Sequence, residues 1–174
     1  MLHHSDDTSG CLSKYHQVHL DKGWEHGCGY HFVIGNGSQT ADGAVEVSNR
    51  WREQLQGAHA KTPDNLFNEH GVGICLVGNF DVGSDRPTAA QMRSLARLVQ
   101  YLIDRYDIRP SNVLGHGQCK ATACPGRNFP WAELRAQLKR AADELQAGAD
   151  PRGIGGILLL LTPEQRAIFE RTQS

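Results

Sequence analysis

The sequence predicts a single α/β domain in which α-helices flank a central, mixed β-sheet. Three features point to this fold class. Residues 72–80 are an almost continuous apolar run, too short for a lone helix and typical of a strand buried on both faces. Two later segments repeat apolar residues at helical spacing, as helices that cover a sheet do. A chain of 174 residues that is 39% hydrophobic suits one domain with a substantial core.

The first strand is expected at the very start of the chain, where Met1 and Leu2 lead into His3 and His4. Only two residues precede His3, so we expect that the chain begins inside this strand, because an upstream stretch was lost or the start site was misassigned. Adjacent residues of a strand point to opposite faces of the sheet. Only one of the two histidines can therefore reach a given site.

A helix is expected over residues 11–21, because Leu12, Tyr15 and His19 fall on one helical face. We expect His16 and His19 to be surface or half-buried helix residues rather than metal ligands.

The next two strands follow this helix. Residues 29–37 are rich in Tyr, Phe, Val and Ile and close with Gly-Asn-Gly, which predicts a strand that runs into a tight turn. Val45 and Val47 predict the second strand after a short polar loop. The apolar run at 72–80 then supplies the central strand of the sheet.

The clearest helix begins at a capping-box pattern made by Thr88 and Gln91. Its apolar positions recur at helical spacing and are Met92, Leu95, Ala96, Val99, Leu102, Ile103 and Tyr106. Beyond Pro110, Val113 and Leu114 predict a short strand that delivers His116 to the edge of the sheet. A second amphipathic helix, ending before Gly148, is predicted by Trp131, Leu134, Leu138, Ala141 and Leu145.

Composition divides the chain into a domain over residues 1–147 and a tail over residues 148–174. The tail opens with a linker rich in proline and glycine, and we expect it to end in an accessory helix. Its apolar run, residues 157–161, is far too short to span a membrane. We therefore expect no membrane span.

Charge and cysteine content exclude some functions and leave others open. A net charge of -1 argues against nucleic acid as a partner, because binding to a polyanion needs a basic face. Five cysteines are an odd number, so at least one thiol is unpaired or bound to metal. Spacing leaves open whether the other four, Cys11, Cys28, Cys75 and Cys119, form two disulfides or stay free. The N-terminus has no signal-peptide pattern, and the compartment stays unknown.

Residues 115–126, with the sequence GHGQCKATACPG, hold the strongest candidate for chemistry. His116 and Cys124 are eight residues apart, which is wrong for one helix face, but a loop shaped by glycine can fold both side chains onto one point. His3 offers a third ligand. Two imidazoles and a thiolate are a common zinc set, and three protein ligands leave a fourth position open, as catalytic sites do.

Several motifs occur in an order that resembles one family. They are His3, Gly29-Tyr30, Gly57-Ala58-His59-Ala60, the strand over residues 73–80, and residues 116–126. In this order they resemble the zinc-dependent N-acetylmuramoyl-L-alanine amidases, which include phage lysozyme-type amidases and the peptidoglycan recognition proteins. The resemblance covers residues 1–147. It implies zinc at one end of the sheet, in a peptide-binding groove, and hydrolysis of the amide between N-acetylmuramic acid and L-alanine. It also implies peptidoglycan as the partner, through its glycan strand and stem peptide, with a monomer acting in the periplasm or outside the cell.

The resemblance assigns roles to individual residues. It implies that His3, His116 and Cys124 bind Zn2+, and that Tyr30 is the tyrosine beside the metal, where it orients water or stabilises an oxyanion. Thr122 matches a threonine of the recognition proteins, at a position where phage enzymes carry lysine. Tyr30 and Thr122 are thus the expected catalytic residues.

Three further residues are expected to bind substrate. His59 matches a histidine in the cleft of the recognition proteins. It can either contact the substrate or have a structural role in its loop, and both alternatives stay open. Arg50 and Trp51 fall near the segment that sets stem-peptide preference. Their spacing departs from the animal pattern, so no preference for diaminopimelate or lysine is assigned.

Three alternatives to the zinc amidase remain. The first is a recognition module that binds peptidoglycan without cleaving it, although such relatives commonly lose the cysteine ligand that this chain retains. The second is a thiol hydrolase in which His116 activates Cys124 as the nucleophile. The third is a cytoplasmic amidase acting on recycled muropeptides.

Overall fold

A computed structural model describes residues 1–146. Its centre is one mixed, four-stranded sheet with the strand order β1-β4-β2-β3. β4 runs parallel to both of its neighbours, and β3 is antiparallel to β2. The strands are β1 Leu2–His4, β2 Phe32–Ile34, β3 Val45–Val47 and β4 Ile74–Leu76. The mixed sheet and the interior position of the apolar strand are both confirmed. The expected linker and accessory helix, residues 148–174, lie outside the described residues.

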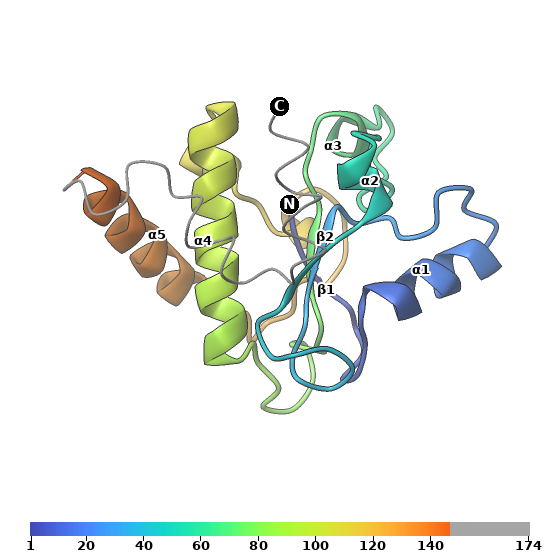
Figure 1. Cartoon of the computed structure of the whole chain (residues 1–174), viewed down its shortest axis with the longest axis horizontal. Helices are drawn as coiled ribbons and strands as arrows, with labels where there is room; N and C mark the ends of the chain where they lie inside the picture. Colours follow the sequence, from blue (N-terminus) through green and yellow to red (C-terminus); the bar gives the residue numbers. More distant parts are fainter. Residues whose placement is uncertain (147–174) are drawn as a thin grey trace.

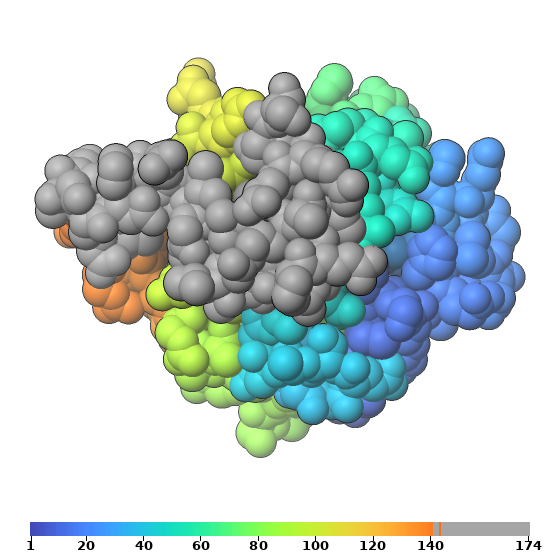
Figure 2. Space-filling view, viewed as in Figure 1, coloured from blue at the N-terminus to red at the C-terminus, as the bar shows by residue number. Residues whose placement is uncertain are grey.

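Helices cover the two faces of this sheet unequally. α4 (Ala89–Tyr106) and α5 (Trp131–Gln146) lie on one side of the sheet and α1 (Leu12–Asp21) on the other (Figure 1). On the face shown in Figure 2, the blue atoms of the α1 segment form the right-hand edge of the molecule. The remaining elements are short. They are α2 Asn49–Arg52, α3 Leu66–Glu69 and the 3₁₀ turns η1 Pro110–Asn112 and η2 His116–Gln118. No helix of the described residues is long and apolar enough to cross a membrane.

β4 is buried on both faces, and its alternating side chains enter two different clusters. Ile74 and Leu76 belong to the main core, which α4 covers, whereas Cys75 belongs to a smaller cluster with Tyr15 of α1. In the parallel register His3 lies opposite Cys75. His3 therefore faces the α1 side of the sheet, and its neighbour His4 faces the α4 side.

α4 begins at the predicted capping box. Thr88 Oγ1 accepts a hydrogen bond from Gln91 N at 3.0 Å, and Gln91 Oε1 accepts one from Thr88 N at 3.1 Å. The amide of Gln91 also donates to the carbonyl oxygens of Ile34 at 3.0 Å and Val77 at 2.9 Å. Gln91 thus completes the capping box and also ties the first turn of α4 to the ends of β2 and β4.

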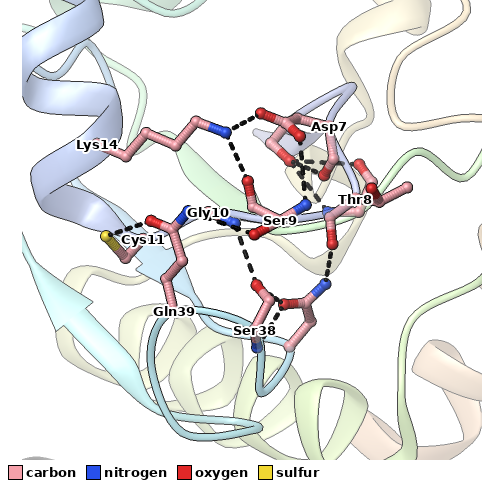
Figure 3. A network of polar contacts seen from close by, with 11 residues as sticks. Asp7, Thr8, Ser9, Gly10, Cys11, Lys14, Ser38 and Gln39 are labelled. Atoms are coloured by element: carbon pink, nitrogen blue, oxygen red, sulfur yellow. Dashed lines mark hydrogen bonds and ion pairs between the residues drawn. The ribbon is translucent and has the colours of Figure 1, made fainter.

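The loop between β1 and α1 is held by a polar network that Figure 3 shows. Lys14 forms an ion pair with Asp7, and its ammonium donates to the carbonyl oxygen of Ser9 at 2.7 Å. Gly10 N donates to the hydroxyl of Ser38 at 3.1 Å, and this bond joins the loop to the turn between β2 and β3. α1 is therefore anchored at its start to the sheet that it covers.

One predicted element differs from the structure. Val113 and Leu114 do not form a strand with a ladder: Leu2 N donates to Leu114 O at 2.7 Å, and a single parallel bridge joins Leu2 to Gly115. The segment is too short for a strand, because one 3₁₀ turn ends at Asn112 and the next begins at His116. The bridge still brings His116 to the edge of β1.

All five cysteines are free thiols in the structure. Of the two alternatives that spacing left open, the structure therefore favours free thiols over disulfides. Cys119 is partly exposed, and the other four are buried.

His31, a buried histidine directly before β2, predicts that the protein loses stability in acid. Gly73 N donates to His31 Nδ1 at 3.0 Å, and His31 Nε2 donates to Leu55 O at 3.2 Å. Burial, the largest effect, lowers the pKa of His31 to about 4. Because the folded pKa lies below the unfolded value, the unfolded chain takes up the proton first. The contribution of His31 to the free energy of unfolding is therefore complete above about pH 6.5. It decreases by about 3 kcal/mol as the pH falls towards 4.

Denaturant unfolding at pH 7 and pH 4.5, with a chelator present, measures this loss. His31→Asn keeps an acceptor for Gly73 N but cannot take up the proton, so its stability should fall less between the two pH values. Burial also lowers the pKa of His19 to about 4. Because His19 is present in both proteins, the difference between their losses of stability reports on His31. An equal fall in both proteins would contradict the prediction.

Candidate metal centre

The three predicted ligands meet at one point. His3, His116 and Cys124 can each offer one ligand atom, and these atoms all lie within 4.8 Å of one another. The Nδ1 atom of His3 lies 3.7 Å from the Cys124 sulfur, and the rings of His3 and His116 are 4.7 Å apart. The first comes from β1 and the other two from the loop that begins at η2. The structure therefore brings together side chains from both ends of the domain.

The two adjacent histidines of β1 point in opposite directions, as alternation requires. His3 faces the cluster, whereas His4 Nδ1 accepts a hydrogen bond from Phe80 N at 3.0 Å. Only His3 is therefore available to this site.

A glycine lets the loop fold back on itself. Gly117 N donates to Cys124 O at 2.6 Å, and a Cβ atom at Gly117 would lie only 2.7 Å from the carbonyl oxygen of Thr122. Real Cβ atoms do not approach so closely, so the loop can close in this way only around glycine. This closure places His116 beside Cys124.

The end of the loop is pressed against the chain that follows β4. Gly126 has a φ of 99°, and a Cβ atom there would lie 2.3 Å from the carbonyl carbon of Phe80. Asn128 N donates to Phe80 O at 2.9 Å. Cys124 is therefore fixed from both sides, by Gly117 before it and by Gly126 after it.

The donor atoms of the cluster suit a soft divalent cation. His116 Nε2 is buried and has no hydrogen-bond partner within the described part of the chain. Burial lowers the pKa of His3 well below its usual value, which keeps the imidazole neutral, and raises the pKa of the Cys124 thiol to about 11. Zinc prefers neutral imidazole and thiolate ligands. A bound cation would deprotonate the Cys124 thiol. These residues could hold a zinc ion.

Tyr30 lies beside the cluster. Its ring centre is 5.1 Å from that of His3, and it packs with the small core under α1. Burial first, and then the neighbouring Cys75, raise the pKa of Tyr30 well above its usual value. The phenol therefore keeps its proton at neutral pH and can only act there as a hydrogen-bond donor or acceptor, not as a base.

Thr122 is exposed and lies two residues before Cys124. Its hydroxyl accepts a hydrogen bond from Cys124 N at 3.3 Å. It lines an open pocket of about 300 Å³ together with Cys124, and the same pocket reaches Asp81 and Arg127. Thr122 thus lies beside Cys124 on the wall of this pocket.

His59 is buried in the loop before β4, with both ring nitrogens occupied. Its Nδ1 lies 3.1 Å from His3 Nε2, and its Nε2 lies 3.2 Å from the carbonyl oxygen of Gly71. Burial, the largest effect, lowers the pKa of His59 to about 3. These contacts show that His59 is a hydrogen-bonded residue of its loop, and its role in substrate binding stays a prediction.

Arg50 and Trp51 do not lie with the cluster. The guanidinium of Arg50 donates to the carbonyl oxygens of Cys28 and Gln56, both at 2.7 Å, and its side chain is buried. Trp51 packs on Phe32 in the main core, with ring centres 4.7 Å apart. Both residues line a separate cavity of about 320 Å³. Their role in substrate binding stays a prediction, and these contacts show that both also stabilise the fold.

Asn68 was not singled out from the sequence, yet it holds the segment next to the cluster. Its Oδ1 atom accepts hydrogen bonds from His59 N and Ala60 N, both at 2.8 Å. An asparagine in a polar loop has no distinctive local signal. Only the fold shows which backbone amides it binds.

Comparison with known proteins shows the family of the chain. Residues 1–127 match the family described as N-acetylmuramoyl-L-alanine amidase. A peptidoglycan-recognition protein of Drosophila simulans is 32% identical over 102 residues, which are 58% of this chain and 49% of that protein. The endolysin of Enterobacteria phage T3 is 35% identical over 113 residues, which are 63% of this chain and 65% of the endolysin. The chain thus spans about half the length of the recognition protein and about two thirds of the endolysin.

A solved structure is also similar. The N-acetylmuramoyl-L-alanine amidase LysC from Clostridium intestinale URNW superposes with a TM-score of 0.67 at 33% identity, covering 79% of this chain and 82% of that one. Its fold confirms the predicted mixed sheet flanked by helices. Because the family match covers well over half of the residues, the chain belongs to the N-acetylmuramoyl-L-alanine amidase family.

Proposed function

We propose that this protein is a zinc-dependent amidase that hydrolyses the bond between N-acetylmuramic acid and L-alanine in peptidoglycan. The observation that carries the proposal is the meeting of His3, His116 and Cys124, with one ligand atom from each within 4.8 Å of the others. Three protein ligands of these types are typical of catalytic rather than structural zinc. Membership of an amidase family supports the same reaction.

In this proposal His3, His116 and Cys124 hold the zinc ion. When bound, zinc acts as a Lewis acid that polarises a carbonyl group and lowers the pKa of water. The protein contributes the rigid placement of the three ligands, through β1 and through the loop closed around Gly117. Ligands that are already in place would hold the ion without a rearrangement of the protein.

Tyr30 and Thr122 are the proposed catalytic residues. The Tyr30 phenol stays protonated, and its ring lies next to that of His3. In this proposal its hydroxyl donates a hydrogen bond to the oxygen that becomes negative as the amide is attacked. Thr122 offers a second hydroxyl from the exposed rim, but it carries no charge. We therefore expect Tyr30 to contribute more to the rate than Thr122.

The proposed substrate is peptidoglycan, bound by a monomer through the glycan strand and the stem peptide. The open pocket of about 300 Å³ beside Cys124 supports this, because it offers space for a bound molecule next to one of the three proposed ligands. The recognition protein and the endolysin among the relatives support action in the periplasm or outside the cell. Residues 1–147 form the proposed amidase domain, and residues 148–174 the proposed linker and accessory helix.

A second candidate function is binding to peptidoglycan without cleavage. The similarity to a peptidoglycan-recognition protein favours it. The two functions differ in one respect that can be measured, which is whether the amide bond is broken.

Two measurements on one preparation test the proposal. Elemental analysis of the purified chain should find about one zinc ion per chain, and incubation with peptidoglycan should release new amino termini on L-alanine. A chelator should stop the release, and added zinc should restore it. Binding to peptidoglycan without release would establish the recognition module instead. Release that resists the chelator but stops on thiol alkylation would overturn the role of zinc.

A further inference from the structure

We infer that His59 is a positioning residue for the metal centre: its imidazole fixes which nitrogen of His3 carries the proton, and so turns the free Nδ1 of His3 towards Cys124. The inference rests on the proposed function only where it names zinc as the cation. The hydrogen bonds that carry it are features of the protein itself.

The proton positions follow from a chain of three groups. A carbonyl oxygen can only accept, so His59 Nε2, 3.2 Å from Gly71 O, must carry the proton of that ring. In a neutral imidazole the other nitrogen is then an acceptor. His59 Nδ1 therefore accepts, and His3 Nε2, 3.1 Å away, must donate.

Because Nε2 of His3 carries the proton, Nδ1 of the neutral ring has none. Nδ1 of His3 lies 3.7 Å from the Cys124 sulfur, on the side of the ring that faces the cluster. A metal ligand needs a free lone pair on the nitrogen that faces the metal, and a hydrogen bond from the other nitrogen fixes both the tautomer and the ring orientation. His59 accepts that hydrogen bond from His3.

His59 is itself held on every side. Asn68 Oδ1 accepts hydrogen bonds from His59 N and Ala60 N, both at 2.8 Å. A Cβ atom at Gly57 or at Gly73 would lie 2.4 Å from the imidazole of His59. Both neighbours must therefore lack a side chain for the ring to occupy this place. Such a close fit leaves the ring few alternative positions.

Two substitutions separate the two hydrogen bonds of His59. His59→Asn keeps an acceptor near the position of Nδ1, so it can still accept from His3 but cannot reach Gly71. His59→Gln places its amide near the position of Nε2, so it can still donate to Gly71 but offers His3 no acceptor. The two variants are similar in polarity and size. They form a matched pair in which only the partner that is retained differs.

Zinc affinity should separate this pair. Loss of a hydrogen-bond partner behind a metal ligand typically weakens metal binding roughly 10–100-fold. We expect that loss in His59→Gln, and an affinity closer to that of the unsubstituted chain in His59→Asn. Denaturant unfolding of both metal-free variants shows whether they are equally stable. Equal zinc affinity in the two variants, or weaker binding by His59→Asn, would overturn the inference.

NMR of the unsubstituted, metal-free chain provides a direct readout that needs no variant. With ¹⁵N-labelled histidine, the one-bond coupling identifies the protonated nitrogen of each ring, and a coupling across the hydrogen bond should join His3 Nε2 to His59 Nδ1. A proton found on His3 Nδ1, or no coupling between the two rings, would refute the assignment.

These readouts separate the inference from the proposed function. If the coupling and the difference in zinc affinity are present but no amide is cleaved, the proposed function fails and the role of His59 stands. If amide cleavage is present but the proton lies on His3 Nδ1, the role of His59 fails and the amidase stands.

Discussion

Replacing Cys124 with alanine is expected to remove bound zinc and to abolish amide cleavage while the fold is retained. The sulfur is one of the three donor atoms that lie within 4.8 Å of one another, and two imidazoles alone bind zinc far more weakly than the complete set. The Lewis acid contributes several kcal/mol to transition-state stabilisation, so activity should fall by at least about 10³-fold. His116→Ala should give the same result.

The fold should survive because alanine fills most of the space of a buried cysteine. Cys124 is held by the backbone of its loop, through Gly117 N to Cys124 O, and this bond does not depend on the side chain. Circular dichroism and denaturant unfolding of the chelated proteins measure this. Cys119→Ala is the matched control, since Cys119 lies in the same loop, is partly exposed and is not one of the three candidate ligands.

The outcome is read from zinc content and from release of amino termini on L-alanine. The control should bind zinc and cleave like the unsubstituted chain. Amide hydrolysis by purified Cys124→Ala or His116→Ala at an undiminished rate would show that zinc held by these residues is not the catalyst.

The elements that could be predicted from the sequence are those whose signals are local. The capping box of Thr88 and Gln91 and the apolar spacing after it are properties of consecutive residues, and α4 begins where they predict. The apolar run at 72–80 predicted β4 for the same reason, since a strand buried on both faces needs apolar side chains at successive positions. No knowledge of partners was needed for either.

The failed strand at Val113 and Leu114 shows the limit of such signals. β-branched and apolar residues favour an extended backbone, but a ladder also needs a partner of matching length. β1 offers only Leu2–His4, and Gly115 forms one bridge with it before η2 begins. The available partner is a property of the fold, so the local pattern overestimated the strand.

The site was predictable only in part. His3 and Cys124 are 121 residues apart, and the ordered motifs of the family resemblance, rather than their spacing, made them partners. The buried guanidinium of Arg50, which donates to the carbonyl oxygens of Cys28 and Gln56, also helps to hold the fold, and this contribution was not predicted from the sequence. The hydrogen bond between His59 and His3 depends on where the carbonyl of Gly71 lies. The residues next to Arg50 and His59 in the sequence give no signal for either set of hydrogen bonds.

Tyr30→Phe is expected to lower kcat by roughly 10²–10³-fold, or about 3–4 kcal/mol, with little change in KM. The substitution removes only the hydroxyl, which the proposal assigns to the oxygen that becomes negative during attack. A donor of this kind acts in the transition state, so its loss lowers kcat rather than weakening substrate binding. The ring of Tyr30 keeps its contact with His3, so zinc content should not change.

The control for this variant is Tyr15→Phe, because Tyr15 is buried in the same small cluster under α1 but contributes no atom to the proposed metal centre. It should retain both kcat and zinc. Steady-state kinetics on a soluble muramyl peptide, with zinc measured in each sample, then distinguishes three outcomes for Tyr30→Phe. A fall in kcat with zinc retained supports a hydroxyl that acts in the reaction, and a loss of zinc would mean that Tyr30 supports the ligands instead. Unchanged kcat with zinc retained would exclude Tyr30 from the chemistry and leave the charge on the oxygen to the metal and to Thr122.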